Sequence, residues 1–320
     1  MTKKERVLAA IRGEELDAIP SCFSLHFPKD CNSGAAGVRA HLDFFRETDT
    51  DILKIMNENL VPNYGRMNRA DLYESLLPAF GVRDSWMQQQ LTFTRQILDG
   101  CEKEAFTLGT LHGITASALH PLEKMGLSYE EARILQVSLL RENPRKMMTA
   151  FRRIADGMCE LARGYIEAGV DGVYYAALGG ERCYFTDEEF AEWIEPLDKQ
   201  IMAAVREAGG YCFLHICKSG LNMERYKDYY DACDVVNWGV YEAPMSLEEG
   251  RRLFPGKAVM GGLPNRHGVL VDGDASAVRE AVQKVIAEWG RRGLILGADC
   301  TLATEQDLSL VRAAVEAGRE

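Results

Sequence analysis

The chain has 320 residues, of which 47% are hydrophobic, and its formal net charge is −11 from 37 basic and 48 acidic residues. A chain of this size buries a large core and accommodates one α/β barrel or two small domains. The acidic balance, together with the lack of any Lys/Arg-rich run, excludes nucleic acid as an expected partner.

The sequence carries no mark of a membrane or secreted protein. The start, residues 1–6, is charged and is followed by no apolar signal core, and no apolar stretch is long enough to span a bilayer. Nine cysteines are scattered without a framework spacing, so we expect them to be reduced. These features predict a cytoplasmic protein with no membrane partner.

Short apolar, β-rich runs alternate with amphipathic helices along the chain, which is typical of a parallel α/β fold. The first helix is predicted to begin at Thr2, because Thr2 and Glu5 form a capping-box pattern. Eight strands are predicted after it, at residues 19–27, 51–56, 106–111, 172–176, 211–217, 234–240, 257–262 and 293–298.

Further capping patterns predict helix starts at Thr186/Glu189, Ser246/Glu249 and Thr304/Asp307. The segment 57–100 is long and helical in character, and we interpret it as an insertion. Eight strands alternating with helices predict a single (β/α)8 TIM barrel with an N-terminal helix. We expect residues 1–320 to form this one barrel domain.

Catalytic side chains of such a barrel lie at the carboxyl ends of its strands. This rule selects candidate substrate-binding residues: His26, Asn57, Glu58, His112, Tyr174, Asn237 and Asp299. Each has a more ordinary alternative, such as a hydrogen-bonded structural histidine, a solvated Glu58 or an Asp299 that caps the next helix. Tyr174 and Tyr175 are neighbours on one strand, so only one of them can face the barrel interior.

A metal site is predicted at the end of the fifth strand. His215 and Cys217 are two residues apart, so they share one face of the strand. Cys300 follows the eighth strand and would lie at the same end of the barrel. One imidazole and two thiolates suit zinc, and three protein ligands with an open position are typical of catalytic zinc. The alternative is that these cysteines are small buried hydrophobes.

The sequence resembles the uroporphyrinogen decarboxylase superfamily over nearly its whole length. The resemblance rests on residues 4–14, 185–190, 260–263 and 296–300, and on a His-x-Cys motif with a lone cysteine far downstream. Within the superfamily, it is closest in pattern to the cobalamin-dependent methyltransferase branch, which includes the methylcobamide:coenzyme M methyltransferases. The decarboxylase branch has an arginine-rich loop after its first strand, whereas residues 24–29 here contain no arginine.

This resemblance implies a catalytic zinc ion held by His215, Cys217 and Cys300. It also implies a methylcobamide on a partner corrinoid protein as the methyl donor, and a small thiol such as coenzyme M or homocysteine as the acceptor. Two alternatives stay open: a metal-free decarboxylase of the uroporphyrinogen type, and a non-catalytic partner of a corrinoid protein on the same barrel.

Overall fold

Eight parallel strands form one sheet in the order β1-β8-β7-β6-β5-β4-β3-β2. The computed structural model describes residues 1–243 and 245–320. The strands are β1 Ser21–Cys22, β2 Ile52–Ile55, β3 Phe106–His112, β4 Gly172–Ala177, β5 Tyr211–Ile216, β6 Val235–Trp238, β7 Ala258–Leu263 and β8 Leu294–Ala298.

The two ends of this sheet meet at Ser21 and Asp51. The Asp51 backbone N–H donates to the Ser21 carbonyl oxygen over 3.1 Å. In return, the Asp51 carboxylate accepts hydrogen bonds of 3.0 Å from both the backbone N–H and the hydroxyl of Ser21. These contacts bring β1 to β2 and close the barrel, so the predicted (β/α)8 fold is confirmed.

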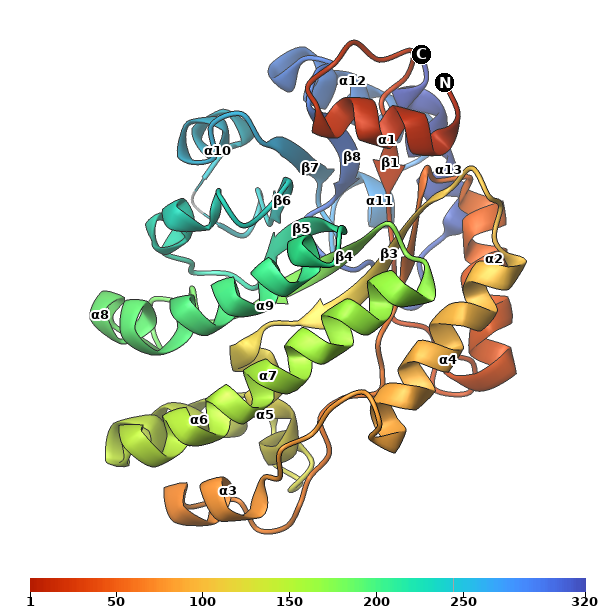
Figure 1. Cartoon of the computed structure of the whole chain (residues 1–320). Coiled ribbons are helices and arrows are strands. Elements are labelled where there is room, and N and C mark those ends of the chain that lie inside the picture. Colours follow the sequence, from red (N-terminus) through yellow and green to blue (C-terminus); the bar gives the residue numbers. More distant parts are fainter. Residues whose placement is uncertain (244) are drawn as a thin grey trace.

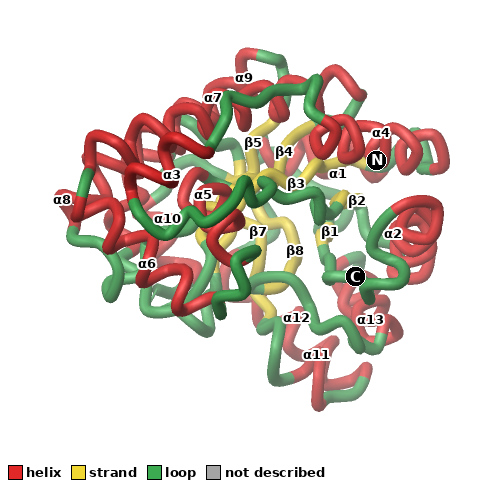
Figure 2. The backbone as a smooth tube through the Cα atoms, turned by 90° about the horizontal axis from the view of Figure 1, so that it is seen from below, coloured by secondary structure: helices red, strands yellow, loops and turns green. Residues whose placement is uncertain are grey.

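Helices surround the strands on the outside, as Figure 2 shows. The α-helices are α1 Lys3–Ile11, α2 Gly34–Thr48, α3 Ala70–Leu76, α4 Ser85–Gly100, α5 Ile114–Glu123, α6 Tyr129–Glu142, α7 Pro144–Ala168, α8 Asp187–Glu189, α9 Glu195–Glu207, α10 Leu247–Leu253, α11 Val269–Asp272, α12 Ala275–Trp289 and α13 Leu308–Gly318. A π-helical turn, Phe190–Ile194, joins α8 to α9, and a 3-10 helix covers Met223–Tyr229. The predicted helical insertion at 57–100 is confirmed as α3 and α4.

The N-terminal helix α1 lies across one end of the barrel (Figure 1). Its Lys4 backbone N–H donates to the Glu104 carbonyl over 2.7 Å, and the Lys4 ammonium pairs with Asp171. Arg6 of α1 pairs with Asp51. Asp51, Glu104 and Asp171 each precede a strand, so α1 covers the end opposite the carboxyl ends of the strands.

The first predicted strand, residues 19–27, is wrong in length. Only Ser21 and Cys22 pair with β8, opposite Leu296 and Gly297. Because β8 ends at Ala298, no regular partner continues beyond this point, and a single bridge from Leu25 to Leu302 follows. The other predicted strands agree with the structure to within two residues at each end.

Three of the four predicted capping boxes form, at Thr2/Glu5, Thr186/Glu189 and Ser246/Glu249. The fourth, at Thr304/Asp307, is wrong. Asp307 is itself the N-cap of α13 and accepts from the Ser309 backbone N–H, while the Thr304 hydroxyl donates to the His26 carbonyl over 2.9 Å. An Asp three residues after a Thr can act as either capping residue, and here local hydrogen bonding selects the Asp.

All nine cysteines are free thiols, as the scattered spacing predicted. In the described part of the chain, none of the helices has both the length and the apolar composition that a bilayer crossing requires.

Candidate metal centre and cavity

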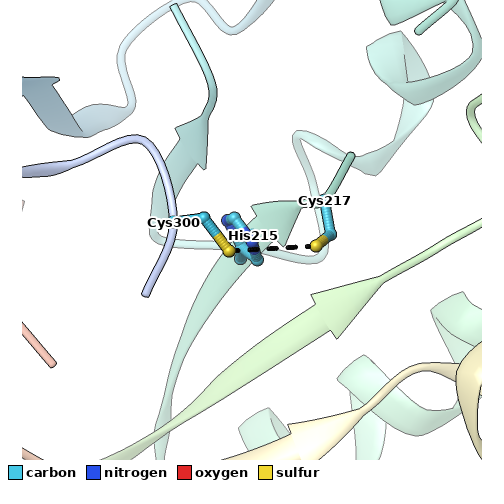
Figure 3. A group of neighbouring side chains, drawn as sticks. All are labelled: His215, Cys217 and Cys300. Atoms are coloured by element: carbon cyan, nitrogen blue, oxygen red, sulfur yellow. Dashed lines mark hydrogen bonds between the residues drawn. The ribbon is translucent and has the colours of Figure 1, made fainter. Parts of the chain in front are cut away.

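Three ligand-type side chains meet at the carboxyl ends of β5 and β8. His215 lies near the end of β5, Cys217 directly follows that strand, and Cys300 lies two residues beyond the end of β8. The ligand atoms of the three residues all lie within 4.8 Å of one another. Figure 3 shows Cys217 and Cys300 facing each other, with 4.0 Å between their sulfur atoms and His215 between them in this view.

The geometry and the hydrogen bonding of this group both fit a zinc ion. With zinc–sulfur bonds of about 2.3 Å, two thiolates on a tetrahedral ion lie about 3.8 Å apart, close to the separation of the two sulfur atoms here. His215 is buried, and neither of its ring nitrogens has a hydrogen-bond partner among the described residues. Buried polar atoms are rarely left without a partner. A metal ion is the partner that one imidazole nitrogen and two convergent thiols would share.

The pKa values of the two cysteines are shifted in opposite directions. The hydrogen bond from the Cys217 thiol outweighs burial and holds the pKa of Cys300 well below its usual range, with His215 and Lys54 acting in the same direction. The same hydrogen bond raises the pKa of Cys217. This hydrogen bond favours the thiolate form on Cys300 and the thiol form on Cys217.

Tyr174 lies against His215 of the centre, and Lys54 lies against Tyr174. The Tyr174 ring stacks on the His215 ring with a centroid distance of 5.2 Å and an interplanar angle of 23°. The Lys54 ammonium lies 3.7 Å from the centroid of the same tyrosine ring and donates to the Ser24 hydroxyl over 3.1 Å. The Tyr174 hydroxyl donates to Asn237 over 2.9 Å, which fixes the ring in place.

The centre opens into a cavity of about 310 Å³. One wall is a single face of α5, because Ala116, Leu119, His120 and Glu123 follow helical spacing. The remaining lining residues are His26, Lys54, Met56, Leu60, Thr110, His112, Tyr129, Tyr174, Ala176, Leu178, His215, Cys217, Lys218, Cys300 and Thr301. A mostly apolar cavity with a few convergent polar groups is the usual form of a small-molecule site.

The comparison with protein families identifies the chain. The profile of the family described as "Uroporphyrinogen decarboxylase (URO-D)" matches residues 132–320, which is more than half of the sequence. The chain belongs to the uroporphyrinogen decarboxylase family. A comparison with curated proteins gives no match.

Solved structures with a similar fold include a methyltransferase from Methanosarcina mazei, whose sequence is 16% identical to this chain. That match covers 99% of this chain and 98% of the other, with a TM-score of 0.78. A B12-independent methionine synthase from Shewanella sp. W3-18-1 is 11% identical over 94% of this chain and 97% of its own, with a TM-score of 0.61. A putative vitamin-B12 independent methionine synthase from Listeria monocytogenes is 12% identical over 96% of each chain, with a TM-score of 0.56. At these identities the likeness establishes the fold.

Three of the predicted substrate-binding residues line the cavity of this family member: His26, His112 and Tyr174. Glu58 is not part of this lining; it accepts from His26 Nδ1 over 2.8 Å, and this bond lowers the Glu58 pKa. Burial lowers the pKa of His112 to about 4, so that ring is neutral at physiological pH. Asn57 is outside the cavity, where its side chain accepts from the Asn59 backbone N–H over 3.0 Å in a local turn.

Asn237 and Asp299 also lie outside the cavity lining. Asn237 links β6 to β7 and β8 by hydrogen bonds, because its side-chain amide donates to the carbonyls of Met260 over 2.8 Å and Ala298 over 3.2 Å. Asp299 accepts from the Tyr241 backbone N–H over 2.9 Å, and burial raises its pKa to about 7. The interpretation of Asp299 as a cap of the next helix is wrong, because Asp307 caps α13.

Several residues that line the cavity were not predicted from the sequence. Lys54 occupies the middle of β2, where a buried lysine in a four-residue apolar strand was an available signal. His120, Glu123 and Tyr129 come from α5 and α6, and Lys218 follows Cys217 in a left-handed conformation with φ 84°. The strand-end rule does not select residues on helix faces, so His120, Glu123 and Tyr129 had no signal of that kind, whereas Lys218 lies at the end of β5 and could have been selected.

Proposed function

We propose that this chain is a zinc-dependent methyltransferase that moves a methyl group from a methylated corrinoid to a thiol acceptor such as coenzyme M or homocysteine. The corrinoid would be carried by a partner protein. The observation that carries the proposal is the convergence of His215, Cys217 and Cys300, at strand ends, in the lining of one cavity. We also propose that residues 1–320 act as a single domain.

The three residues would hold zinc and leave one coordination position toward the cavity. Zinc, when bound there, supplies a Lewis acid that lowers the pKa of an acceptor thiol. Apolar side chains of the cavity lining, among them Met56, Leu60 and Leu119, would limit the contact of the acceptor sulfur with water. The transfer would join the acceptor thiolate, already without its proton, to the methyl carbon and would break the cobalt–carbon bond of the donor, whose electron pair would stay on cobalt.

The charges of the cavity argue against the decarboxylase alternative. A porphyrinogen bears several carboxylates, and proteins usually hold these with fixed arginine side chains. The cavity lining contains two lysines, Lys54 and Lys218, and no arginine among the described residues. The segment 24–29 after the first strand also contributes no arginine.

Metal analysis of purified variants tests the proposal. We expect about one zinc per wild-type chain and a loss of zinc in Cys217→Ala and Cys300→Ala, because two ligands cannot replace three. Cys183→Ala is the matched control, since Cys183 is an exposed free thiol away from the centre. Full zinc retention in both ligand variants would overturn the metal assignment.

The acceptor and donor are tested separately by absorbance. Wild-type protein is incubated with methylcobalamin and either coenzyme M or homocysteine, and loss of the methyl–cobalt band reports transfer. We expect transfer with one of these thiols, and at least a 100-fold slower rate in Cys217→Ala and Cys300→Ala. Zinc binding without demethylation by any thiol would favour the non-catalytic alternative.

A further inference from the structure

The centre lacks the hydrogen-bonded support that metal-binding histidines usually have. In most such sites the second ring nitrogen donates to a carboxylate or a carbonyl, and this bond sets the ring orientation. Neither nitrogen of His215 has such a partner among the described residues. The ring instead lies against Tyr174, nearly parallel to it.

The Lys54 ammonium lies against the same Tyr174 ring. This lysine is only 7% exposed and lines the cavity. Its only hydrogen bond in the described ranges goes to the Ser24 hydroxyl, and no carboxylate there lies within 4 Å of its ammonium. Burial lowers the pKa of Lys54, while the sulfur atoms of Cys22, Cys300 and Cys217 act against that effect. A buried cation without an acidic partner is costly, so an anion near it is strongly favoured.

The charge of the centre identifies that anion. Two cysteine thiolates and a neutral imidazole balance one divalent zinc ion, so the occupied centre is neutral. An acceptor that enters as a thiolate adds one negative charge, and an acceptor that enters as a neutral alcohol or amine adds none. Lys54 lines the same cavity, and its protonated form would supply one positive charge there.

We propose that Tyr174 and Lys54 are positioning residues of this centre: the Tyr174 ring orients His215 by stacking, and the Lys54 ammonium offsets the charge of a thiolate acceptor. This inference rests on the proposed function and deepens it. It specifies an acceptor class that binds as an anionic sulfur. It also separates two roles, since Tyr174 acts on metal affinity and Lys54 acts on acceptor affinity.

Zinc affinity tests the role of Tyr174. Competition with a chelator is measured for the wild type, Tyr174→Phe and Tyr174→Leu. We expect the phenylalanine variant, which keeps the ring, to stay within about threefold of wild type, and the leucine variant to lose about 10- to 100-fold in zinc affinity. The absorption spectrum of the cobalt(II)-substituted protein should change in Tyr174→Leu alone.

Tyr175→Phe is the matched control, because Tyr175 is the next residue and faces outward to Asp198. It removes a buried hydrogen bond and lowers stability, and we expect unchanged zinc affinity. A structural role for Tyr174 would likewise lower the melting temperature without changing zinc affinity. Wild-type zinc affinity in Tyr174→Leu would overturn this role.

Thiol binding tests the role of Lys54. The probe is 2-mercaptoethanol, whose only anionic form is the thiolate, titrated into the cobalt(II)-substituted protein while the sulfur-to-cobalt absorption is followed. We expect Lys54→Met to keep metal and to bind this thiol roughly tenfold more weakly, as loss of one nearby charge implies. Lys124→Met is the control, since among the described residues Lys124 donates only to the backbone carbonyls of Leu60 and Val61.

The outcomes separate this inference from the proposed function. A wild-type chain that binds no zinc would overturn both. A wild-type chain that binds zinc, with unchanged thiol affinity in Lys54→Met, would overturn the role of Lys54 while leaving the metal centre intact.

Discussion

Asp198 of α9 is a buried carboxyl group that supports the cavity wall from behind. It accepts from the Ile114 backbone N–H over 3.0 Å, at the start of α5, and from the hydroxyls of Tyr175 and Tyr229. These bonds favour the ionised form, but burial outweighs them and raises the Asp198 pKa to about 6. The α5 helix that lines the cavity is thus anchored by a group that titrates near neutrality.

This pKa predicts how stability depends on pH. The folded state keeps the Asp198 proton up to about pH 6, whereas the unfolded chain loses it near the ordinary value of 3.8. The stability contribution is therefore present at low pH and is lost as pH rises through 6, by roughly 3 kcal/mol in total. Urea unfolding of wild type and Asp198→Asn from pH 4 to 8 measures it as a difference between the two proteins.

The asparagine keeps an acceptor for Ile114 and a donor for Tyr229, and it carries no charge. We expect Asp198→Asn to be more stable than wild type at pH 7.5 and about equal to it near pH 4. A variant that is less stable than wild type at pH 7.5 would contradict the assigned pKa.

At the scale of single residues, the sequence predicted the centre better than its surroundings. Side chains alternate along a strand, so the sequence alone predicts that His215 and Cys217 share one face. The supporting contacts of Tyr174 and Lys54 involve β2, β4 and β5 at once. Such contacts depend on the stagger of strands in a closed barrel, which local spacing does not encode.

At the scale of elements, the N-terminal helix and the closure of the barrel depend on one buried ion pair. Asp51 is fully buried, holds Ser21 of β1 and pairs with Arg6 of α1. Removing the arginine would leave a buried carboxylate without its cation, which is more damaging than removing an exposed pair. α1, β1 and β2 are therefore expected to respond as a unit.

We expect Arg6→Met to destabilise the protein by about 2 kcal/mol. Chemical unfolding monitored by circular dichroism gives this value. Arg12→Met is the matched control from the other end of α1, where Arg12 pairs with Glu14 on the surface, and we expect no measurable change there. Equal effects of the two substitutions would show that the Asp51 pair does not close the barrel.

The starts of some helices follow from the local sequence, whereas the length of a strand does not. Capping at Thr2, Thr186 and Ser246 was predictable because each box is a local arrangement of side chains and backbone. The short length of β1 was not predictable, because it is set by the point at which β8 ends. Strand length is a property of pairs of strands, whereas helix capping is a property of a few consecutive residues.

At the scale of the whole molecule, we expect the barrel to fold without the proposed metal. A contiguous apolar core runs through the strands and the surrounding helices, from Val7 to Ala317. The proposed ligands come from only two strand ends, and three ligands with an open position are typical of catalytic rather than structural zinc. The protein should therefore stay folded after the metal is removed.

Chelation tests this expectation. After dialysis against a strong chelator, we expect an unchanged far-ultraviolet circular dichroism spectrum and a cooperative thermal transition. Added zinc should raise the melting temperature in a concentration-dependent manner, as for any ligand of the native state. An unfolded metal-free protein would indicate a structural zinc and would contradict the proposed open site.

The sequence by itself determined the fold class, the position of most elements and the placement of His215, Cys217 and Cys300 at the same end of the barrel, while their role as metal ligands stays a prediction. It could do so because strand and helix periods, capping boxes and strand-end chemistry are local properties of the chain. Three contacts were decided only by the tertiary structure. Asn237 donates to the Met260 carbonyl, Asp299 accepts from the Tyr241 backbone N–H, and Lys54 lies against the Tyr174 ring. The physical reason is that closing eight strands brings residues far apart in sequence to a few ångströms, and burial then sets their charge and contacts.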